Sequence, residues 1–166
     1  MAFDKISGLP EWEDDDDFRE DDEEGEEWKP KPTTEACRAM YGQWQQVMVV
    51  LNGALDSMNT DTGEDSFPPD YWEEHKAMLL GDAYQVAVKI KSSEVGMYMI
   101  RMENASIIRK NAQYIKSAML TMMGEGAIEE AHGRVIREEI DKFRLLFCHW
   151  VSTFERDEFT DEWGLF

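Results

Sequence analysis

Residues 33–58 read TTEACRAMYGQWQQVMVVLNGALDSM. Apolar side chains recur in this stretch at steps of three and four, which is the spacing of one face of an α-helix. The apolar positions are Cys37, Met40, Tyr41, Trp44, Val47, Met48, Leu51, Leu55 and Met58. No polar residue interrupts the series. The stretch therefore predicts an amphipathic helix with one wide buried face.

Three later segments repeat this period, at residues 69–90, 97–123 and 127–157. Pro68 or Pro69 suits the first turn of the second segment, and a GEG sequence at 124–126 ends the third. The positions expected to be buried are Trp72, Leu79, Ala83, Val86 and Ile90, then Met97, Ile100, Ile107, Ile108, Ile115, Met119 and Met122, then Ile136, Ile140, Phe143, Leu146, Phe147, Trp150, Val151 and Phe154. No run alternates with period two, so we predict an all-α domain.

The segment KSSEVG at residues 91–96 leaves two architectures open. Its serines and glycine favour a turn, whereas the apolar seam continues through it in helical register. With a turn here, the chain forms a compact four-helix antiparallel bundle, which is the fold we expect. Without one, a single helix over 69–123 would be about 80 Å long and would pack with the first and fourth helices, in a homodimer.

The net charge of −19 is unevenly distributed along the 166 residues. Residues 1–32 carry −10, residues 33–154 carry −5, and residues 155–166 carry −4. Prolines in KPKP at 29–32 indicate a linker. We therefore expect an acidic, largely irregular arm over 1–32, a helical domain over 33–157 and a tail over 158–166.

This charge excludes some classes of function and leaves others open. A direct nucleic-acid binder needs a basic surface, and an anionic membrane also attracts basic segments, so we expect neither activity. The sequence has no stretch typical of a signal peptide or a membrane span, which predicts a cytoplasmic protein. Its two cysteines, Cys37 and Cys148, are expected to be buried thiols in a reducing compartment.

Aromatic side chains stand among the acids of both terminal segments. They suit anchors for a partner's pocket, while the carboxylates would steer a basic partner. The candidate partner-binding residues are Trp12, Phe18, Trp28, Trp163 and Phe166, with Asp14, Asp15, Asp16 and Asp17. The alternative is that these rings dock on the protein's own bundle. Our leading hypothesis is a non-enzymatic interaction or adaptor protein that binds a basic protein surface. A second is an acidic mimic of nucleic acid that occupies a DNA- or RNA-binding protein.

Polar residues also occur inside the apolar stripes of the last three segments. They are His75, Asp82, Asn104, Asn111, His132 and Glu139. Antiparallel counting places Asn111 opposite Glu139, with His75 at the same level. We interpret the set as a buried, hydrogen-bonded polar layer that fixes helix register. The alternative is a metal-dependent hydrolase or oxidase with its site in the bundle core. One carboxylate and one histidine make too poor a ligand set, so we predict no metal, cofactor or catalytic residue.

Overall fold

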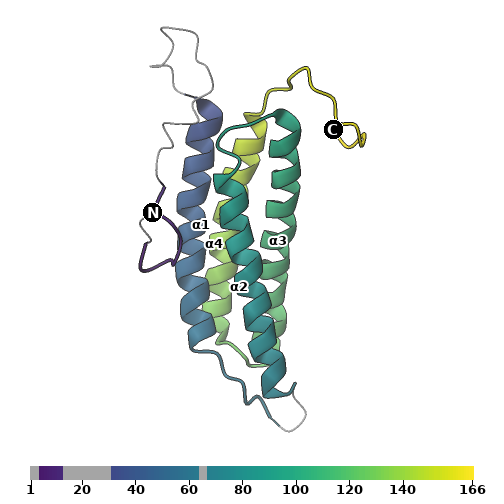
Figure 1. Ribbon diagram of the computed structural model, residues 1–166. Helices are drawn as coiled ribbons and strands as arrows, with labels where there is room; N and C mark the ends of the chain where they lie inside the picture. Colours follow the sequence, from purple (N-terminus) through teal and green to yellow (C-terminus); the bar gives the residue numbers. More distant parts are fainter. Residues whose placement is uncertain (1–3, 13–30, 64–66) are drawn as a thin grey trace.

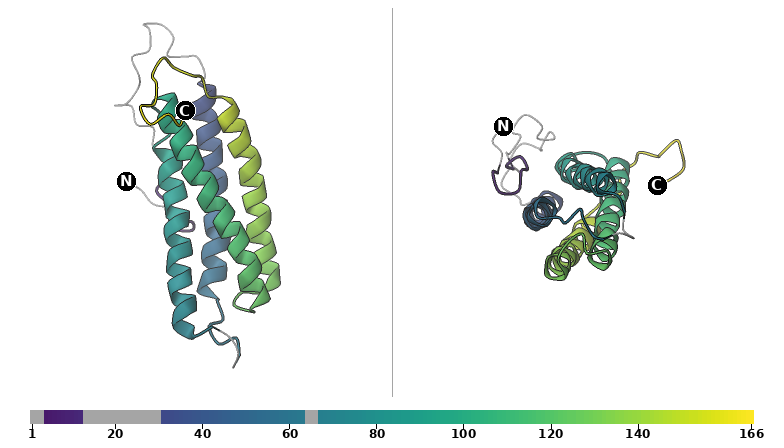
Figure 2. Two further views of the ribbon diagram at one scale, coloured as in Figure 1. Left: turned by 90° about the vertical axis from the view of Figure 1, so that its right-hand side faces the viewer. Right: turned by 90° about the horizontal axis from the view of Figure 1, so that it is seen from below.

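The computed structural model describes residues 4–12, 31–63 and 67–166 (Figure 1). Its four helices are α1 (Pro32–Asp56), α2 (Pro69–Lys91), α3 (Tyr98–Gly124) and α4 (Glu130–Ser152). They run alternately up and down, and each packs against its two neighbours in the order α1, α2, α3, α4 and back to α1 (Figure 2). The predicted all-α, four-helix antiparallel bundle is confirmed. The alternative of one long helix over 69–123 is wrong.

Helix α1 supplies a continuous part of the core. It begins at Pro32, whose fixed φ and missing N–H suit the first turn of a helix. All nine positions of the predicted stripe face the bundle, although Met58 lies just beyond the helix end and is only half-buried. The Trp44 indole N–H donates to the Ala83 carbonyl at 2.9 Å, and its ring centroid lies 4.7 Å from that of Phe143. This ring therefore joins α1 to both α2 and α4.

The chain reverses between α2 and α3, where the sequence left the choice open. Gly96 adopts a φ of +126°, which side-chain-bearing residues rarely reach. Ser93 is fully buried, and its hydroxyl donates to the Lys89 carbonyl at 2.6 Å. The Asn104 amide in turn donates to the Ser93 hydroxyl at 2.9 Å. The buried face therefore continues from α2 to α3 through a hydrogen-bonded polar pair, Ser93 in the turn and Asn104 on α3.

The buried face of α3 differs from the predicted one in its first half. Met97 and Ile100 are exposed, and Ile107 is only half-buried. The buried positions of the helix are Asn104, Ala105, Ile108, Asn111, Ala112, Ile115, Ala118, Met119 and Met122. The inward face is therefore rotated toward alanines and asparagines, whose small side chains allow neighbouring helices to approach.

Helix α4 ends at Ser152, five residues earlier than predicted. Phe154 nevertheless packs inward, edge-on to Trp150 with ring centroids 4.6 Å apart. Cys37 is buried as expected, but the prediction for Cys148 is wrong, because its side chain lies on the exposed face of α4. No helix among the described residues is long and apolar enough to cross a membrane.

The start of α1 and the end of α4 lie together at one end of the bundle. The Thr33 hydroxyl donates to the Thr153 carbonyl at 3.1 Å. The turn between α2 and α3 occupies the same end (Figure 1). The opposite end holds the α1–α2 loop and the α3–α4 turn. The backbone N–H of Asn59 joins them by donating to the Ala127 carbonyl at 2.8 Å.

Candidate interaction surface

Residues 153–166, called the C-terminal segment below, are fastened to the start of α3. The Asp157 carboxylate accepts the backbone N–H of Tyr98 at 2.8 Å and that of Phe159 at 3.1 Å. The Tyr98 amide is one of the first-turn donors that α3 itself cannot satisfy. The Arg156 guanidinium also lies 5.5 Å from the centroid of the Tyr98 ring. The segment therefore acts as the cap of a helix that lies about 60 residues earlier in the chain.

Replacing Asp157 by alanine should lower the free energy of unfolding by about 1 kcal/mol, because α3 loses its only side-chain cap among the described residues. The matched control is Glu155→Ala at an exposed position two residues earlier, which should leave stability within about 0.5 kcal/mol of wild type. Urea denaturation followed by circular dichroism measures both. Equal effects of the two substitutions would show that Asp157 does not cap α3.

Residues 161–165, called the tail loop below, are closed on one aspartate. The Asp161 carboxylate accepts the backbone N–H of Trp163 at 3.0 Å and that of Leu165 at 2.7 Å. Gly164 has a φ of +70° and donates its N–H to the Asp161 carbonyl at 3.0 Å. These three bonds fix the direction of the loop. The Trp163 side chain is nevertheless 89% exposed.

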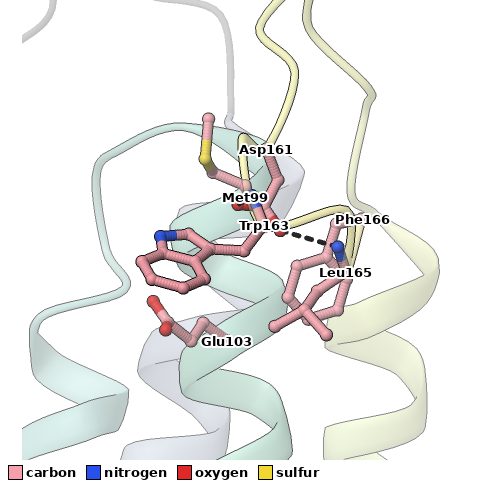
Figure 3. A pocket seen from close by; sticks show the side chains of 6 residues that line it. All are labelled: Met99, Glu103, Asp161, Trp163, Leu165 and Phe166. Carbon is pink, nitrogen blue, oxygen red and sulfur yellow. Dashed lines mark hydrogen bonds between the residues drawn. The ribbon is translucent and has the colours of Figure 1, made fainter.

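A hollow of about 360 Å³ lies between this loop and the first two turns of α3. Its lining consists of Met99, Glu103, Asp161, Trp163, Leu165 and Phe166 (Figure 3). The Glu103 carboxylate lies beside the Trp163 indole in this view. Glu103 forms no ion pair within the described parts of the chain, so its charge is open to a cation from outside. An aromatic face next to a carboxylate is an arrangement that attracts a guanidinium or ammonium group.

Trp12 packs against the protein's own bundle, which is the alternative considered for the aromatic residues of the terminal segments. Its ring makes an edge contact with Tyr41 at 5.2 Å between centroids. The Lys91 ammonium lies 4.0 Å from the centroid of the same ring. The Trp12 ring is therefore already in contact with side chains of the bundle in this structure. The other N-terminal candidates, Phe18, Trp28 and Asp14, Asp15, Asp16 and Asp17, lie outside the described residues.

The six polar candidates do not form one layer. Asn104 and Asn111 are buried, but they bind different partners, since Asn111 donates to the Gln85 side-chain oxygen at 2.5 Å. Glu139 is half-buried and accepts from Gln43 of α1 at 2.7 Å. Hydrogen bonds from Lys142 and then from Gln43 lower the pKa of the Glu139 carboxyl. The expected pairing of Asn111 with Glu139 is therefore wrong, because α2 supplies the partner of Asn111 and α1 supplies a partner of Glu139.

The remaining three polar candidates are not fully buried. His75 stacks on Tyr71 with centroids 5.7 Å apart and meets Tyr114 edge-on at 6.4 Å. Its partial burial lowers the pKa of the imidazole. Asp82 is half-buried, and the prediction is wrong for His132, which is exposed on the first turn of α4. Within the described ranges, no group of three His, Cys, Asp or Glu side chains is placed to hold a metal ion.

Two features of the surface were not foreseen from the sequence. One is the contribution of Met99 and Glu103 to the hollow, which depends on where the C-terminal segment folds back. The other is the burial of Leu9 and Ser7 from the N-terminal segment. A signal for the second was present, because SGLP at residues 7–10 combines a turn sequence with an apolar side chain.

Comparison with known proteins adds no further constraint. No protein-family model matches the chain, and no curated protein or solved structure matches it either.

Proposed function

We propose that this protein is a non-enzymatic helical interaction protein that binds a basic surface of a partner protein through its C-terminal segment. The observation that carries the proposal is the 89% exposure of Trp163 on a loop held by three hydrogen bonds. A large aromatic ring loses solvent contact favourably when a partner covers it, and tryptophan is enriched among residues that dominate binding energy.

The fixed loop favours binding for a second reason. A flexible tail loses conformational entropy when a partner orders it, and that loss reduces affinity. Here the Asp161 carboxylate already holds the amides of Trp163 and Leu165. The backbone that carries the exposed ring is therefore ordered before a partner arrives. Neighbouring apolar side chains of Phe159 and Leu165, both exposed, extend the contact area.

Charge supports a basic partner. Residues 155–166 contain five acids and one base, and Glu103 adds a further carboxylate inside the hollow. Such a potential raises the association rate with a positively charged surface and suppresses acidic partners. The hollow is suited to one cationic side chain of that surface, an arginine or a lysine, with its apolar stem on Met99 and its charge near Glu103.

Replacing Trp163 by alanine should weaken partner binding at least tenfold, as expected when a central aromatic anchor is lost. The full-length chain is used to capture proteins from an extract of its source cells, and the captured proteins are quantified by mass spectrometry. The matched control is Leu145→Ala, which removes another exposed apolar side chain, in the second half of α4. Basic proteins captured by wild type and by Leu145→Ala should be depleted with Trp163→Ala.

The same captures at rising salt test the electrostatic part of the proposal. Retention should fall between about 50 and 300 mM salt, since exposed charges are screened over a few ångströms at the higher value. Glu103→Gln should weaken binding and reduce this salt dependence. Identical capture by wild type and Trp163→Ala would overturn the proposal. The nucleic-acid mimic remains an alternative whose main carboxylates, at 14–17, lie outside the described residues.

A further inference from the structure

The described N-terminal residues, Asp4–Trp12, form a compact unit that we call the hook. Asp4 closes it, because its backbone N–H donates to the Leu9 carbonyl at 2.8 Å and its carbonyl accepts the Gly8 N–H at 2.9 Å. The Asp4 carboxylate also accepts the amides of Ile6 and Ser7 at 3.1 and 3.2 Å. Gly8 supports the turn with a φ of +71°. Most of the hook's backbone hydrogen bonds are therefore made within the hook.

The hook rests on α1 and α2 through a set of contacts that we call the seat, made by Tyr41 and Asn52 of α1 and Tyr84 and Lys91 of α2. The Tyr41 hydroxyl donates to the Pro10 carbonyl at 2.5 Å. The Asn52 side-chain amide donates to the Ser7 carbonyl at 3.2 Å. Gly8 lies so close to Tyr84 that an added Cβ would be 3.3 Å from its hydroxyl. Two of these contacts hold the hook by its backbone carbonyls, those of Ser7 and Pro10.

Two side chains of the hook provide the apolar part of the contact. Leu9 is 1% exposed and belongs to the bundle's core cluster. Trp12 lies between Tyr41 and Lys91 at the contact distances given above. Ile6, in contrast, is 72% exposed and points to solvent. The groups of the hook that contact the seat are therefore the buried Leu9 side chain, the Trp12 ring and the two carbonyls that accept hydrogen bonds.

The hook is not continuous with either helix that holds it. Nineteen residues separate Trp12 from Pro32 at the start of α1. The seat lies on the α1–α2 side of the bundle, away from the C-terminal segment on α3 (Figure 2). Since most of the hook's backbone groups are bonded within the hook, a similar segment on another polypeptide would bring few unpaired backbone groups into the contact.

We infer that the seat is a peptide-binding site, that the hook fills it from within the same chain, and that a partner segment of the same chemistry binds by displacing the hook. The partner segment folds into the same turn, with a small residue and glycine before a leucine and a tryptophan three residues after it. This site is distinct from the tail loop, so its failure in a test would leave the proposed function untouched.

The test uses the full chain and a fluorescein-labelled peptide of residues 4–12, DKISGLPEW, followed by fluorescence anisotropy. The wild-type chain should bind the probe poorly, because its own hook is present at an effective concentration of about 1 mM. Leu9→Ala in the chain weakens the internal hook, so the probe should bind at least tenfold more tightly than to wild type. Ile6→Ala, a matched truncation of the exposed residue, should behave as wild type.

Probe variants complete the experiment. A peptide with the Leu9→Ala change should bind the opened chain at least tenfold more weakly than the unchanged peptide. If Leu9→Ala disturbs the helical circular dichroism, Trp12→Ala serves as the opening variant, since Trp12 is only half-buried. Absence of probe binding to a folded opening variant would overturn the inference, as would equal binding to wild type and to the opening variant.

Discussion

Replacing Trp44 by alanine is expected to lower the free energy of unfolding by about 3–5 kcal/mol. The side chain is fully buried where α1, α2 and α4 meet, so its loss leaves a cavity that none of the three helices can close alone. Domains of this size are stable by about 5–15 kcal/mol, so the variant should lose a large share of its stability. Urea denaturation followed by circular dichroism measures the change.

The matched control is the same chemical change at Trp163. That ring is almost fully exposed, so Trp163→Ala should alter stability by less than about 0.5 kcal/mol. The two variants separate the two uses of tryptophan in this chain, one in the core and one on the surface. If both substitutions destabilised the protein equally, the placement of Trp163 in solvent would be incorrect.

The two thiols should differ in alkylation or disulfide-exchange rate by more than about a thousandfold. Burial raises the pKa of the Cys37 thiol to about 12, with the charge of Glu94 adding to the effect. The Cys37 thiol also donates a hydrogen bond to the Ile90 carbonyl, with the Sγ 3.1 Å from the oxygen. At pH 8 Cys37 is therefore almost entirely protonated, and its complete burial also blocks access to the reagent. Cys148 lies exposed on α4.

Reaction with Ellman's reagent at pH 8 tests this difference directly. The native chain should release one equivalent rapidly, and both should react rapidly in urea. Cys148→Ser should abolish the fast native phase while leaving Cys37 protected. Two fast equivalents from the folded protein would mean that the start of α1 opens readily, against the packing described here.

The comparison of α1 with α3 shows what apolar periodicity predicts well. The α1 stripe is built from large side chains, and a helix with such a stripe gains most by burying it. On α3 the inward positions include Ala105, Ala112 and Asn104, which carry little hydrophobic signal. Exposed Ile100 carries more signal than any of these. The helical period predicted for α3 is therefore correct, but the observed buried face is rotated about the helix axis relative to the predicted one.

The surface was less predictable than the core, because its contacts join residues that are far apart in the sequence. The hook depends on hydrogen bonds between residues 31 and 45 positions apart, and the α3 cap on a bond across 59 positions. Local patterns do not carry such pairings. The sequence does show that acids and aromatics are mixed in the terminal segments, and this mixture predicts Trp163 as an anchor. Glu103 could be assigned to the hollow only from the folded chain.

The hydrogen bond between Thr33 and the Thr153 carbonyl has a consequence for the molecule as a whole. It keeps the start of α1 and the end of α4 together, at the end of the bundle that also holds the α2–α3 turn. The C-terminal segment leaves from this end, and its residues 155–166 carry −4 of the net charge. This charge attracts a positively charged partner before contact. The partner would therefore approach the bundle at this end, with the α1–α2 loop and the α3–α4 turn pointing away from it.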